Sequence, residues 1–358
     1  MRLRELTRFD NIVIQCHDNP DADAVAAGFG IYRYLQGQKK QVKLIYGGRE
    51  KIHKANLLLM VEALDIPIQH QEEPLDAELL VTVDCQYGEG NVTHFDAGQV
   101  AVIDHHIDMG HGADFKDIRS GYGSCSALVW QLLGQEGYDL GEDKDLATAL
   151  YYGLYMDTNS LSEISHPVDR DLRDCVKFHE GLILKLRNTN LSLEEMRIAA
   201  DALRSYEYQE EGHFAIVKTQ PCDPNILGFI SDLMLQVDIV DLCVIYCELP
   251  YGIKLSVRSC VRTVRASELA EFLVQGVGNG GGHAQKAGGF IPKTNLELMA
   301  ADCEPGRYLY GRMEKYCAGC ELLYAKDYVF DREGMGRYEK IPQRLGFVRL
   351  VDILEEGT

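Results

Sequence analysis

Positive charge is scarce in this sequence: 36 Lys and Arg face 55 Asp and Glu, which leaves a formal net charge of −19 over 358 residues. Proteins that hold long duplex nucleic acids gain affinity from many contacts between Lys or Arg and phosphate. We therefore expect no long duplex as a partner. An acidic protein can still bind phosphates where divalent cations neutralise the site, so short nucleotides stay open as substrates.

Long apolar runs are absent as well. The first residues, MRLRELTRFDNIVI, lack the apolar core of a signal peptide, and no run approaches the roughly 20 residues of a membrane-spanning helix. The eleven cysteines lie mostly in apolar stretches such as DLCVIYCEL, which is typical of reduced thiols rather than of a disulfide framework. We expect a cytoplasmic protein with no membrane partner.

The first half alternates β-branched runs with helical patterns. Strands are predicted over 11–16, 41–46, 78–84 and 99–104, and helices over 23–35, 53–64, 125–135 and 145–157. Such alternation predicts an α/β fold with a doubly wound, mostly parallel sheet.

A second, smaller α/β unit is predicted to follow. Its expected elements are strands over 212–219, 240–249 and 253–261, helices over 225–237 and 265–275, and a glycine-rich loop over 276–290. We predict a catalytic domain over 1–185, a helical linker over 186–211, the smaller domain over 212–292, and a tail over 293–358 of unknown role. Alternation in RLGFVRLVDIL predicts one or two strands in that tail.

Acids and histidines follow several of the predicted strands. They are His17, Asp21 and Asp23 after the first strand, Asp84 after the third, Asp104, His105 and His106 after the fourth, and Asp157 at the end of a helix. The carboxyl ends of parallel strands share one edge of a sheet, and ligands bind in the crevice there. We expect these side chains to converge.

Each residue alone has a plainer interpretation. Asp21 or Asp23 can cap the following helix, Asp84 can end a strand in a turn, and Asp157 can be an ordinary helix-end acid. Together, however, so many carboxylates without a basic neighbour repel one another unless cations lie among them. Mixed Asp and His ligands suit Mn²⁺, Mg²⁺ or Co²⁺ rather than a structural zinc. We expect two divalent cations, Mn²⁺ before the others, with one bridging carboxylate.

In order and spacing, the segments HDNPDAD, VTVDC, VIDHH and GLYMDTNS resemble the four metal motifs of the DHH phosphoesterase family. The segment GGGHAQKAG, preceded by SVRS, resembles the DHH-associated C-terminal domain. The resemblance extends over residues 10–292. Its nearest branch is the group of oligoribonucleases and 3′-phosphoadenosine-5′-phosphate phosphatases, with the cyclic-dinucleotide hydrolases adjacent.

The resemblance implies a role for each of these side chains. One metal would be held by His17, Asp21 and Asp84, and the other by Asp23, Asp84, His105 and Asp157. Asp104 would orient a histidine from outside the ligand shell. His106 would face the substrate and either donate a hydrogen bond to the phosphoryl group or protonate the leaving oxygen. Packing under the sheet edge is the plainer role of His106.

In the second domain, the resemblance implies substrate contacts from Arg258, from Gly280, Gly281 and Gly282, and from His283. An arginine can hold phosphate through two hydrogen bonds, and backbone N–H groups of the glycines can form an anion nest, with His283 entering a following helix. A surface arginine and turn glycines are the plainer interpretations. The run 284–288, AQKAG, departs from the basic residue and paired alanines usual in the family, which affects how the distal phosphate or base is held.

Two further features of the sequence give weaker evidence about function. Cys317 and Cys320 form a C-x-x-C pair with only Cys303 upstream, which is a weak zinc signal. The single tryptophan, Trp130, lies in an apolar helix and is predicted to be core.

The leading hypothesis is a Mn²⁺-dependent phosphodiesterase or phosphatase that hydrolyses short oligoribonucleotides, linear dinucleotides or nucleoside 3′,5′-bisphosphates through a water activated by two metals. An inorganic pyrophosphatase of the related DHH class is an alternative, although that class expects a more basic second domain. A non-catalytic nucleotide sensor is another, although every expected ligand is present. The acidity disfavours a processive single-strand exonuclease. A homo-oligomer stays open.

Overall fold

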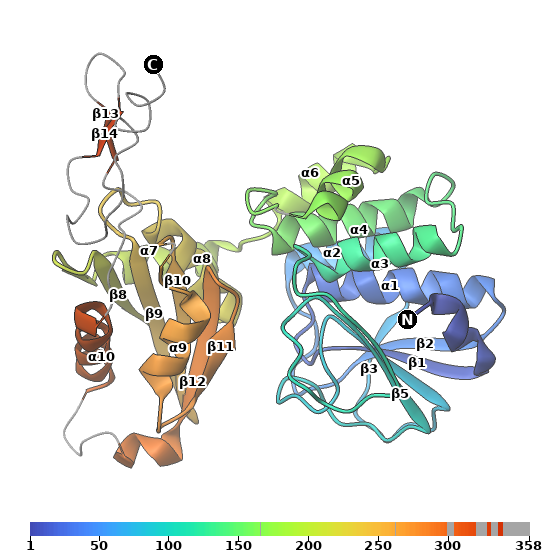
Figure 1. Ribbon diagram of the computed structural model, residues 1–358, viewed down its shortest axis with the longest axis horizontal. Helices are drawn as coiled ribbons and strands as arrows, with labels where there is room; N and C mark the ends of the chain where they lie inside the picture. Colours follow the sequence, from blue (N-terminus) through green and yellow to red (C-terminus); the bar gives the residue numbers. More distant parts are fainter. Residues whose placement is uncertain (165, 262, 299–303, 320–327, 331–335, 339–358) are drawn as a thin grey trace, which may run out of the picture. The chain divides into compact units, whose positions relative to one another are not determined.

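The computed structural model describes residues 1–164, 166–261, 263–298, 304–319, 328–330 and 336–338. Contacts divide the chain into two compact units, Met1–Ser192 and Leu193–Thr358 (Figure 1). The division falls inside the segment 186–211 that was predicted to be a linker. Across the described parts of the chain, no helix combines the length and the apolar character needed to cross a bilayer.

The first unit contains a six-stranded parallel sheet. Its strands are β1 (Asn11–Cys16), β2 (Gln41–Tyr46), β3 (Ile68–His70), β4 (Leu79–Val83), β5 (Gln99–Asp104) and β6 (Phe115–Ile118). They lie in the order β3-β2-β1-β4-β5-β6, and every neighbouring pair is parallel. The direction of winding reverses between β1 and β4. This order confirms the predicted α/β doubly wound sheet, with β3 and β6 as additional short edge strands.

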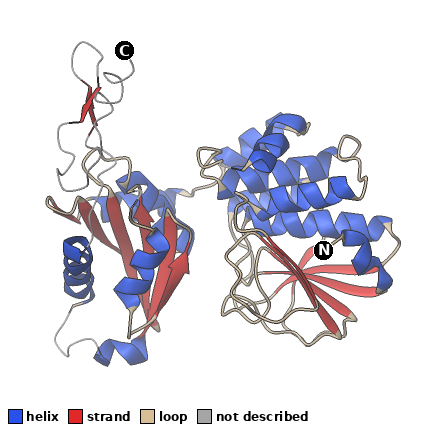
Figure 2. Ribbon diagram, viewed as in Figure 1, coloured by secondary structure: helices blue, strands red, loops and turns tan. Residues whose placement is uncertain are grey.

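Helices cover one face of this sheet (Figure 2). They are η1 (Leu3–Arg8), α1 (Ala22–Gly37), α2 (Ala55–Ala63), α3 (Cys125–Gln135), α4 (Lys144–Asp157), α5 (Pro167–Cys175) and α6 (Glu180–Asn188). Side chains of β1 alternate between the two faces, as the strand geometry requires. Ile12 and Ile14 pack in the main core with α1, α3 and α4, whereas Val13 packs in a smaller cluster with Phe95.

The second unit is built on a mixed six-stranded sheet in the order β11-β12-β10-β9-β8-β7. Its elements are α7 (Leu193–Leu203), β7 (Tyr206–Gln209), β8 (Phe214–Thr219), α8 (Pro224–Met234), β9 (Leu242–Leu249), β10 (Gly252–Ser259), α9 (Ala266–Val274), β11 (Asn279–Gly282) and β12 (Lys286–Pro292). Only β8 and β9 pair in parallel. A second apolar core lies between this sheet and helix α9.

The glycine-rich segment was predicted to be a loop, and this is wrong. It forms β11 and β12, an antiparallel hairpin in which Gly280 pairs with Gly289 and Gly281 with Gly288. Glycine lets β11 approach α9 closely: a Cβ on Gly280 would lie 2.8 Å from the carbonyl oxygen of Ala270. Pattern reading misses such a strand because glycine has a low strand propensity.

Part of the predicted tail belongs to the second core. After η2 (Lys293–Leu298), helix α10 (Pro305–Gly319) buries Leu309 and Met313 in that core. The two short strands β13 (Tyr328–Phe330) and β14 (Gly336–Tyr338) pair with each other. The strands predicted in 344–354 lie outside the described residues.

Candidate metal centre

The candidate site lies at the carboxyl ends of β1, β4 and β5, where the winding direction of the sheet reverses. His17 follows β1, Asp84 follows β4, and His105 follows β5. Asp84 has a backbone φ of 57°, a left-handed conformation that is uncommon for residues other than glycine and is found at functional sites. Its N–H donates to the carbonyl of Ile103 at 3.0 Å, which ties the two strand ends together.

One group of potential ligands contains His17, Asp21 and Asp84, with one ligand atom from each lying within 4.8 Å of the others. His17 Nε2 is 3.9 Å from Asp84 Oδ2. Asp21 also caps α1, because its Oδ1 accepts the N–H groups of Asp23 and Ala24. The capping interpretation of Asp21 is therefore correct for one of its oxygens, and the other oxygen remains for a ligand.

A second group contains Asp23, His105 and Asp157, again within 4.8 Å. His105 Nε2 lies 3.9 Å from Asp23 Oδ2, 3.3 Å from Asp157 Oδ2 and 3.2 Å from Asp84 Oδ1. Asp84 thus presents Oδ2 toward His17 and Oδ1 toward His105. It stands between the two groups, as a bridging carboxylate would.

Asp23 has a second task that the sequence does not reveal. Its carboxylate is buried and accepts the N–H groups of Cys125 and Ser126 at 2.6 and 2.9 Å, which are the first residues of α3. A carboxylate at a helix N-terminus is favoured by the helix dipole. Asp23 caps a helix about a hundred residues away rather than α1, in whose first turn it lies, so no local pattern could identify this role.

The protonation of His105 tests whether these residues fit a cation. His105 Nδ1 lies 3.1 Å from the carbonyl oxygen of Tyr122. A carbonyl oxygen accepts only, so Nδ1 carries a proton. Burial lowers the pKa of His105, but the charges of Asp157, Asp84 and Asp23 outweigh it and raise that pKa well above its usual value. Without a cation Nε2 therefore carries a second proton, and a bound cation would take the place of that proton at the Nε2 lone pair. Asp84 Oδ1, which faces that lone pair, is buried and accepts no hydrogen bond among the described residues. Two lone pairs facing each other at 3.2 Å require a cation or a proton between them.

The pKa values of the neighbouring carboxylates also indicate that a cation is needed. Burial and the charge of Asp84 raise the pKa of Asp23 well above its usual range. Burial, opposed by His105 and reinforced by Asp84, raises the pKa of Asp157 to about 6. These carboxylates therefore resist ionising together. Divalent cations would relieve their repulsion and lower both pKa values.

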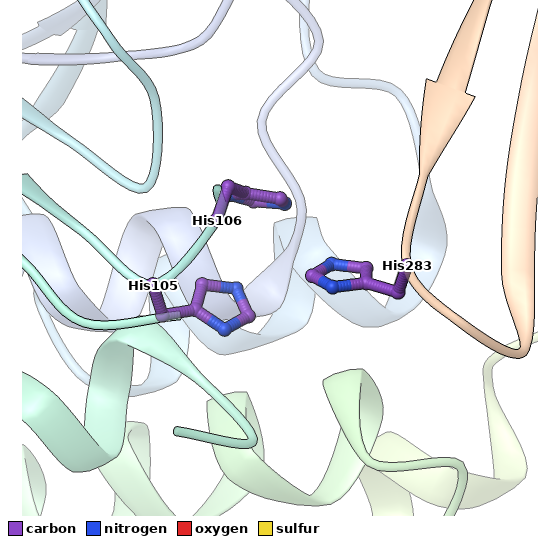
Figure 3. Close-up of side chains that lie close together, drawn as sticks. All are labelled: His105, His106 and His283. Atoms are coloured by element: carbon purple, nitrogen blue, oxygen red, sulfur yellow. The ribbon is translucent and has the colours of Figure 1, made fainter. Parts of the chain in front are cut away.

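Asp104 and His106 form a hydrogen-bonded pair beside the two groups, and one atom of each lies within 4.8 Å of an atom of Asp84. His106 Nδ1 lies 2.8 Å from Asp104 Oδ1, and Gln86 Nε2 donates to Asp104 Oδ2 at 2.8 Å. Burial would raise the pKa of Asp104, but the hydrogen bond and charge of His106 lower it to about 2. Burial would lower the pKa of His106, but the hydrogen bond to Asp104 and the charge of Asp84 raise it to about 9. Figure 3 shows the rings of His105 and His106 on the stretch of chain after β5.

Sequence reasoning did not identify Gln86. This residue is 1% exposed, donates also to the carbonyl of Ile107 at 2.8 Å, and accepts the N–H of Met109 at 2.9 Å. It therefore ties the strand end that carries Asp104 to the chain that follows His106. The signal in the sequence was only its position two residues after Asp84.

In the second unit, Arg258 is not a surface arginine. Its side chain is 11% exposed, with Nε donating to Asp232 Oδ1 at 2.7 Å and Nη1 to Ser256 Oγ at 3.0 Å. Nη2 donates no hydrogen bond among the described residues and is the nitrogen left for a ligand.

His283 does not enter a helix, contrary to our prediction. It lies in the turn between β11 and β12 (Figure 3), where its N–H donates to the carbonyl of Lys286. Gly280, Gly281 and Gly282 lie in strand β11, and successive N–H groups of a strand point to opposite sides. A continuous anion nest of three consecutive N–H groups is therefore not formed there.

The structure also shows where Trp130 and Cys317 lie. Trp130 lies in α3 and is partly buried against the main core. Cys317 lies in α10, and its predicted partner Cys320 is outside the described residues.

Comparisons with known proteins concern the family and the fold of the chain. Residues 11–154 match the family model for the DHH family, N-terminal domain, which confirms the DHH resemblance for the first unit. An uncharacterised protein of Methanocaldococcus jannaschii is 23% identical over 287 residues, covering 78% of this chain and 58% of the relative. An uncharacterised protein of Mycoplasma genitalium is 27% identical over 158 residues, covering 43% and 47%. The chain thus spans about half the length of these curated relatives.

Two solved structures share the fold. An exopolyphosphatase-related protein of Bacteroides fragilis superposes with a TM-score of 0.64 at 19% identity, covering 88% of this chain and 96% of the other. RecJ of Thermus thermophilus in complex with Mn²⁺ superposes with a TM-score of 0.52 at 16% identity, covering 89% and 54%. At these identities the likeness concerns the fold.

Proposed function

We propose that this protein is a phosphoester hydrolase that uses two divalent cations in its first unit. The observation that carries the proposal is the position of Asp84. Its two oxygens face two groups of potential ligands, and the buried Oδ1 accepts no hydrogen bond from the residues that the structure describes. His17, Asp21 and Asp84 would hold one cation. Asp23, His105, Asp157 and the other oxygen of Asp84 would hold the second.

A pair of divalent ions supplies, when bound, a water of lowered pKa and positive charge for the phosphoryl oxygens. The protein's own part is to place a proton donor beside them. Asp104 holds Nδ1 of His106, which fixes the ring and stabilises its protonated form. Nε2 of His106 would then donate its proton to the leaving oxygen as the phosphoester bond breaks.

We propose Mn²⁺ as the ion, with Mg²⁺ and Co²⁺ as substitutes. Mixed carboxylate and imidazole ligands support this choice. RecJ of Thermus thermophilus, which shares the fold, has been determined in complex with Mn²⁺. A group made only of hard carboxylate oxygens would instead have favoured Mg²⁺ or Ca²⁺.

We propose short substrates: oligoribonucleotides of a few residues, linear dinucleotides or nucleoside 3′,5′-bisphosphates. The net charge of −19 opposes the binding of long polyanions, which depends on many basic side chains. Arg258, with Nη2 available, and the hairpin turn that carries His283 are the proposed contacts of the second unit to the non-reacting phosphate or base. Inorganic pyrophosphate is the alternative substrate, and nucleotide sensing without turnover is the alternative function.

An activity panel on the full-length chain tests the proposal. The metal-free protein receives Mn²⁺ and then a diribonucleotide, a nucleoside 3′,5′-bisphosphate, pyrophosphate or a long single strand. We expect release of mononucleotide or phosphate from the first two substrates, and only with the cation. Asp84→Ala should abolish turnover, while Asp96→Ala, whose side chain is 99% exposed, should leave it unchanged. Undiminished turnover by Asp84→Ala, or no cleavage with any divalent cation, would refute the proposal.

A further inference from the structure

One glycine of the first unit lies directly against the buried carboxylate of Asp23. Gly153 belongs to α4, which packs on α1 and on α3. A Cβ on Gly153 would overlap the hydroxyl of Ser126, and it would lie 2.9 Å from Asp23 Oδ1 and 3.1 Å from Asp23 Cα. The absence of a side chain at Gly153 is therefore what lets the backbone of α4 approach Asp23 so closely.

Asp23 is held too firmly to move away from a larger neighbour. Its two oxygens accept the N–H groups of Cys125 and Ser126, and leaving these buried groups without a partner would cost free energy. The Ser126 hydroxyl, by contrast, has no hydrogen-bond partner among the described residues, so it can rotate out of the way. The contact with Asp23 therefore determines how closely α4 can pack against α1.

The packing of α4 in turn determines where Asp157 lies. Asp157 follows Gly153 by four residues on α4, which places the two residues on the same side of the helix. Asp157 Oδ2 is 3.3 Å from His105 Nε2, and Asp23 Oδ2 is 3.9 Å from the same nitrogen. Because Asp23 belongs to α1 and Asp157 to α4, any movement of α4 away from α1 would widen this group of potential ligands.

We propose that Gly153 sets the size of the cation site formed by Asp23, His105 and Asp157, and thereby its preference among divalent ions. This inference rests on the two-cation function proposed above. A small ion such as Mg²⁺ takes ligands at about 2.0–2.1 Å, whereas Ca²⁺ takes them at about 2.3–2.6 Å and in flexible geometry. Close packing at Gly153 keeps the group compact, so the site favours Mn²⁺ over the larger Ca²⁺.

The experiment titrates the metal-free full-length protein by calorimetry with Mn²⁺ and, separately, with Ca²⁺. Wild type should bind two Mn²⁺. In Gly153→Ala, one Mn²⁺ should bind roughly 10- to 100-fold more weakly, the usual cost of disturbing what orients a ligand. Ca²⁺ should lose less affinity than Mn²⁺ does, so the ratio of the two affinities falls. Adding Ser126→Ala removes the hydroxyl but leaves the contact with Asp23, so the defect should persist in the double variant.

Two other glycines provide matched controls for general effects of packing. A Cβ on Gly30 would lie 2.7 Å from Cγ1 of Val129, a close contact between α1 and α3 that lies about two turns along α1 from Asp23. Gly30→Ala should therefore lower the free energy of unfolding but leave the ratio of Mn²⁺ to Ca²⁺ affinity unchanged. Gly134→Ala, at a position of α3 where a Cβ has no neighbour within 4 Å, should change neither quantity.

Asp157→Glu keeps the proposal testable if Gly153→Ala does not fold, because Asp157 is the last residue of α4. A compact site should not accommodate the longer carboxylate, so one Mn²⁺ should bind roughly tenfold more weakly. The proposal is overturned if wild type binds two Mn²⁺ and either variant binds both with unchanged affinity. It is also overturned if Gly30→Ala lowers the affinity ratio as much as Gly153→Ala does. Wild type that binds fewer than two Mn²⁺ would refute the two-cation function as well.

Discussion

His106 Nδ1 lies 2.8 Å from Asp104 Oδ1, and the same oxygen accepts the backbone N–H of His105 at 2.8 Å. One buried carboxylate thus fixes the ring of one histidine and the backbone of the other. The imidazole placed in this way is 42% exposed at its side chain, so it can meet a ligand while its other nitrogen stays anchored. His106 also lies near the ligand groups, since its Nδ1 is 3.8 Å from Asp84 Oδ1, but its hydrogen bond to Asp104 supports the proposed role of its Nε2 as proton donor.

The pKa of His106 should depend on Asp104. In the metal-free wild type, NMR titration should give a pKa of about 9, because the carboxylate stabilises the imidazolium. Asp104→Asn removes that charge, so the pKa should fall toward the usual value of about 6.5. An unchanged pKa in the variant would show that the pair is not coupled as described.

The pKa shifts of His106 and Asp104 determine how the pair contributes to the free energy of unfolding at each pH. The raised pKa of His106 means that its contribution is complete below about 6.5 and is lost as the pH rises through about 9. The lowered pKa of Asp104 means that its contribution is complete above about 3.9 and is lost as the pH falls through about 2. The difference in unfolding free energy between wild type and Asp104→Asn should therefore be greatest between those limits and shrink on either side.

Gln86→Leu should destabilise the site without changing a ligand. The substitution retains a similar volume but removes the hydrogen bonds to Asp104, Ile107 and Met109. Leaving buried polar groups unsatisfied should lower the free energy of unfolding by about 1–3 kcal/mol and reduce turnover. Gln99→Leu is the control, because the Gln99 amide makes only a 3.5 Å contact to Asp114. Equal effects of the two substitutions in denaturant titrations would contradict this role.

Arg258→Ala should mainly raise KM for a phosphoester substrate. Losing a charge-assisted hydrogen bond costs about 1.5–3 kcal/mol, which corresponds to roughly a tenfold to hundredfold change. Arg258→Lys retains the charge but not the planar group that holds Asp232, and should recover only part of the affinity. Steady-state kinetics separate the cases: a fall in kcat with KM unchanged would exclude substrate binding as the role of Arg258.

Two neighbouring glycines should respond differently to alanine. A Cβ at Gly280 would meet the backbone of Ala270 at 2.8 Å, whereas a Cβ at Gly281 has no neighbour within 4 Å. Gly280→Ala should therefore cost about 1–3 kcal/mol of unfolding free energy through overpacking, and Gly281→Ala should stay within about 0.5 kcal/mol of wild type. Denaturant unfolding of both full-length variants decides this. Equal stabilities would contradict the close packing of β11 on α9.

The sequence predicted the central strands well because their apolar character is local. β1, β2 and β5 have the predicted bounds, and α3 begins at Cys125 as expected. The edge strands β3 and β6 were not predicted, because their sequences IQH and FKDI are short and half polar. The glycine-rich hairpin was not predicted, because its stability comes from packing on α9, a tertiary contact that strand propensity does not encode.

The candidate site, like the fold, could be predicted only in part from the sequence. The positions of His17, Asp84 and His105 could be predicted from where the strands end, because a parallel sheet brings those ends to one edge. The capping of α3 by Asp23 and the hold of Gln86 on Asp104 could not, because each joins residues brought together only by the folded sheet. A sequence pattern can therefore place candidate ligands, but it does not reveal the hydrogen bonds that orient them.

We propose that Asp84 serves two cation sites, and calorimetric titration of the metal-free chain with Mn²⁺ measures how many ions bind. Wild type should bind two Mn²⁺ per chain, and Asp84→Asn, which removes the charge but keeps the shape, should lose the binding of both or weaken it strongly. Binding of a single ion by wild type, or two ions bound by Asp84→Asn with unchanged affinity, would contradict the account.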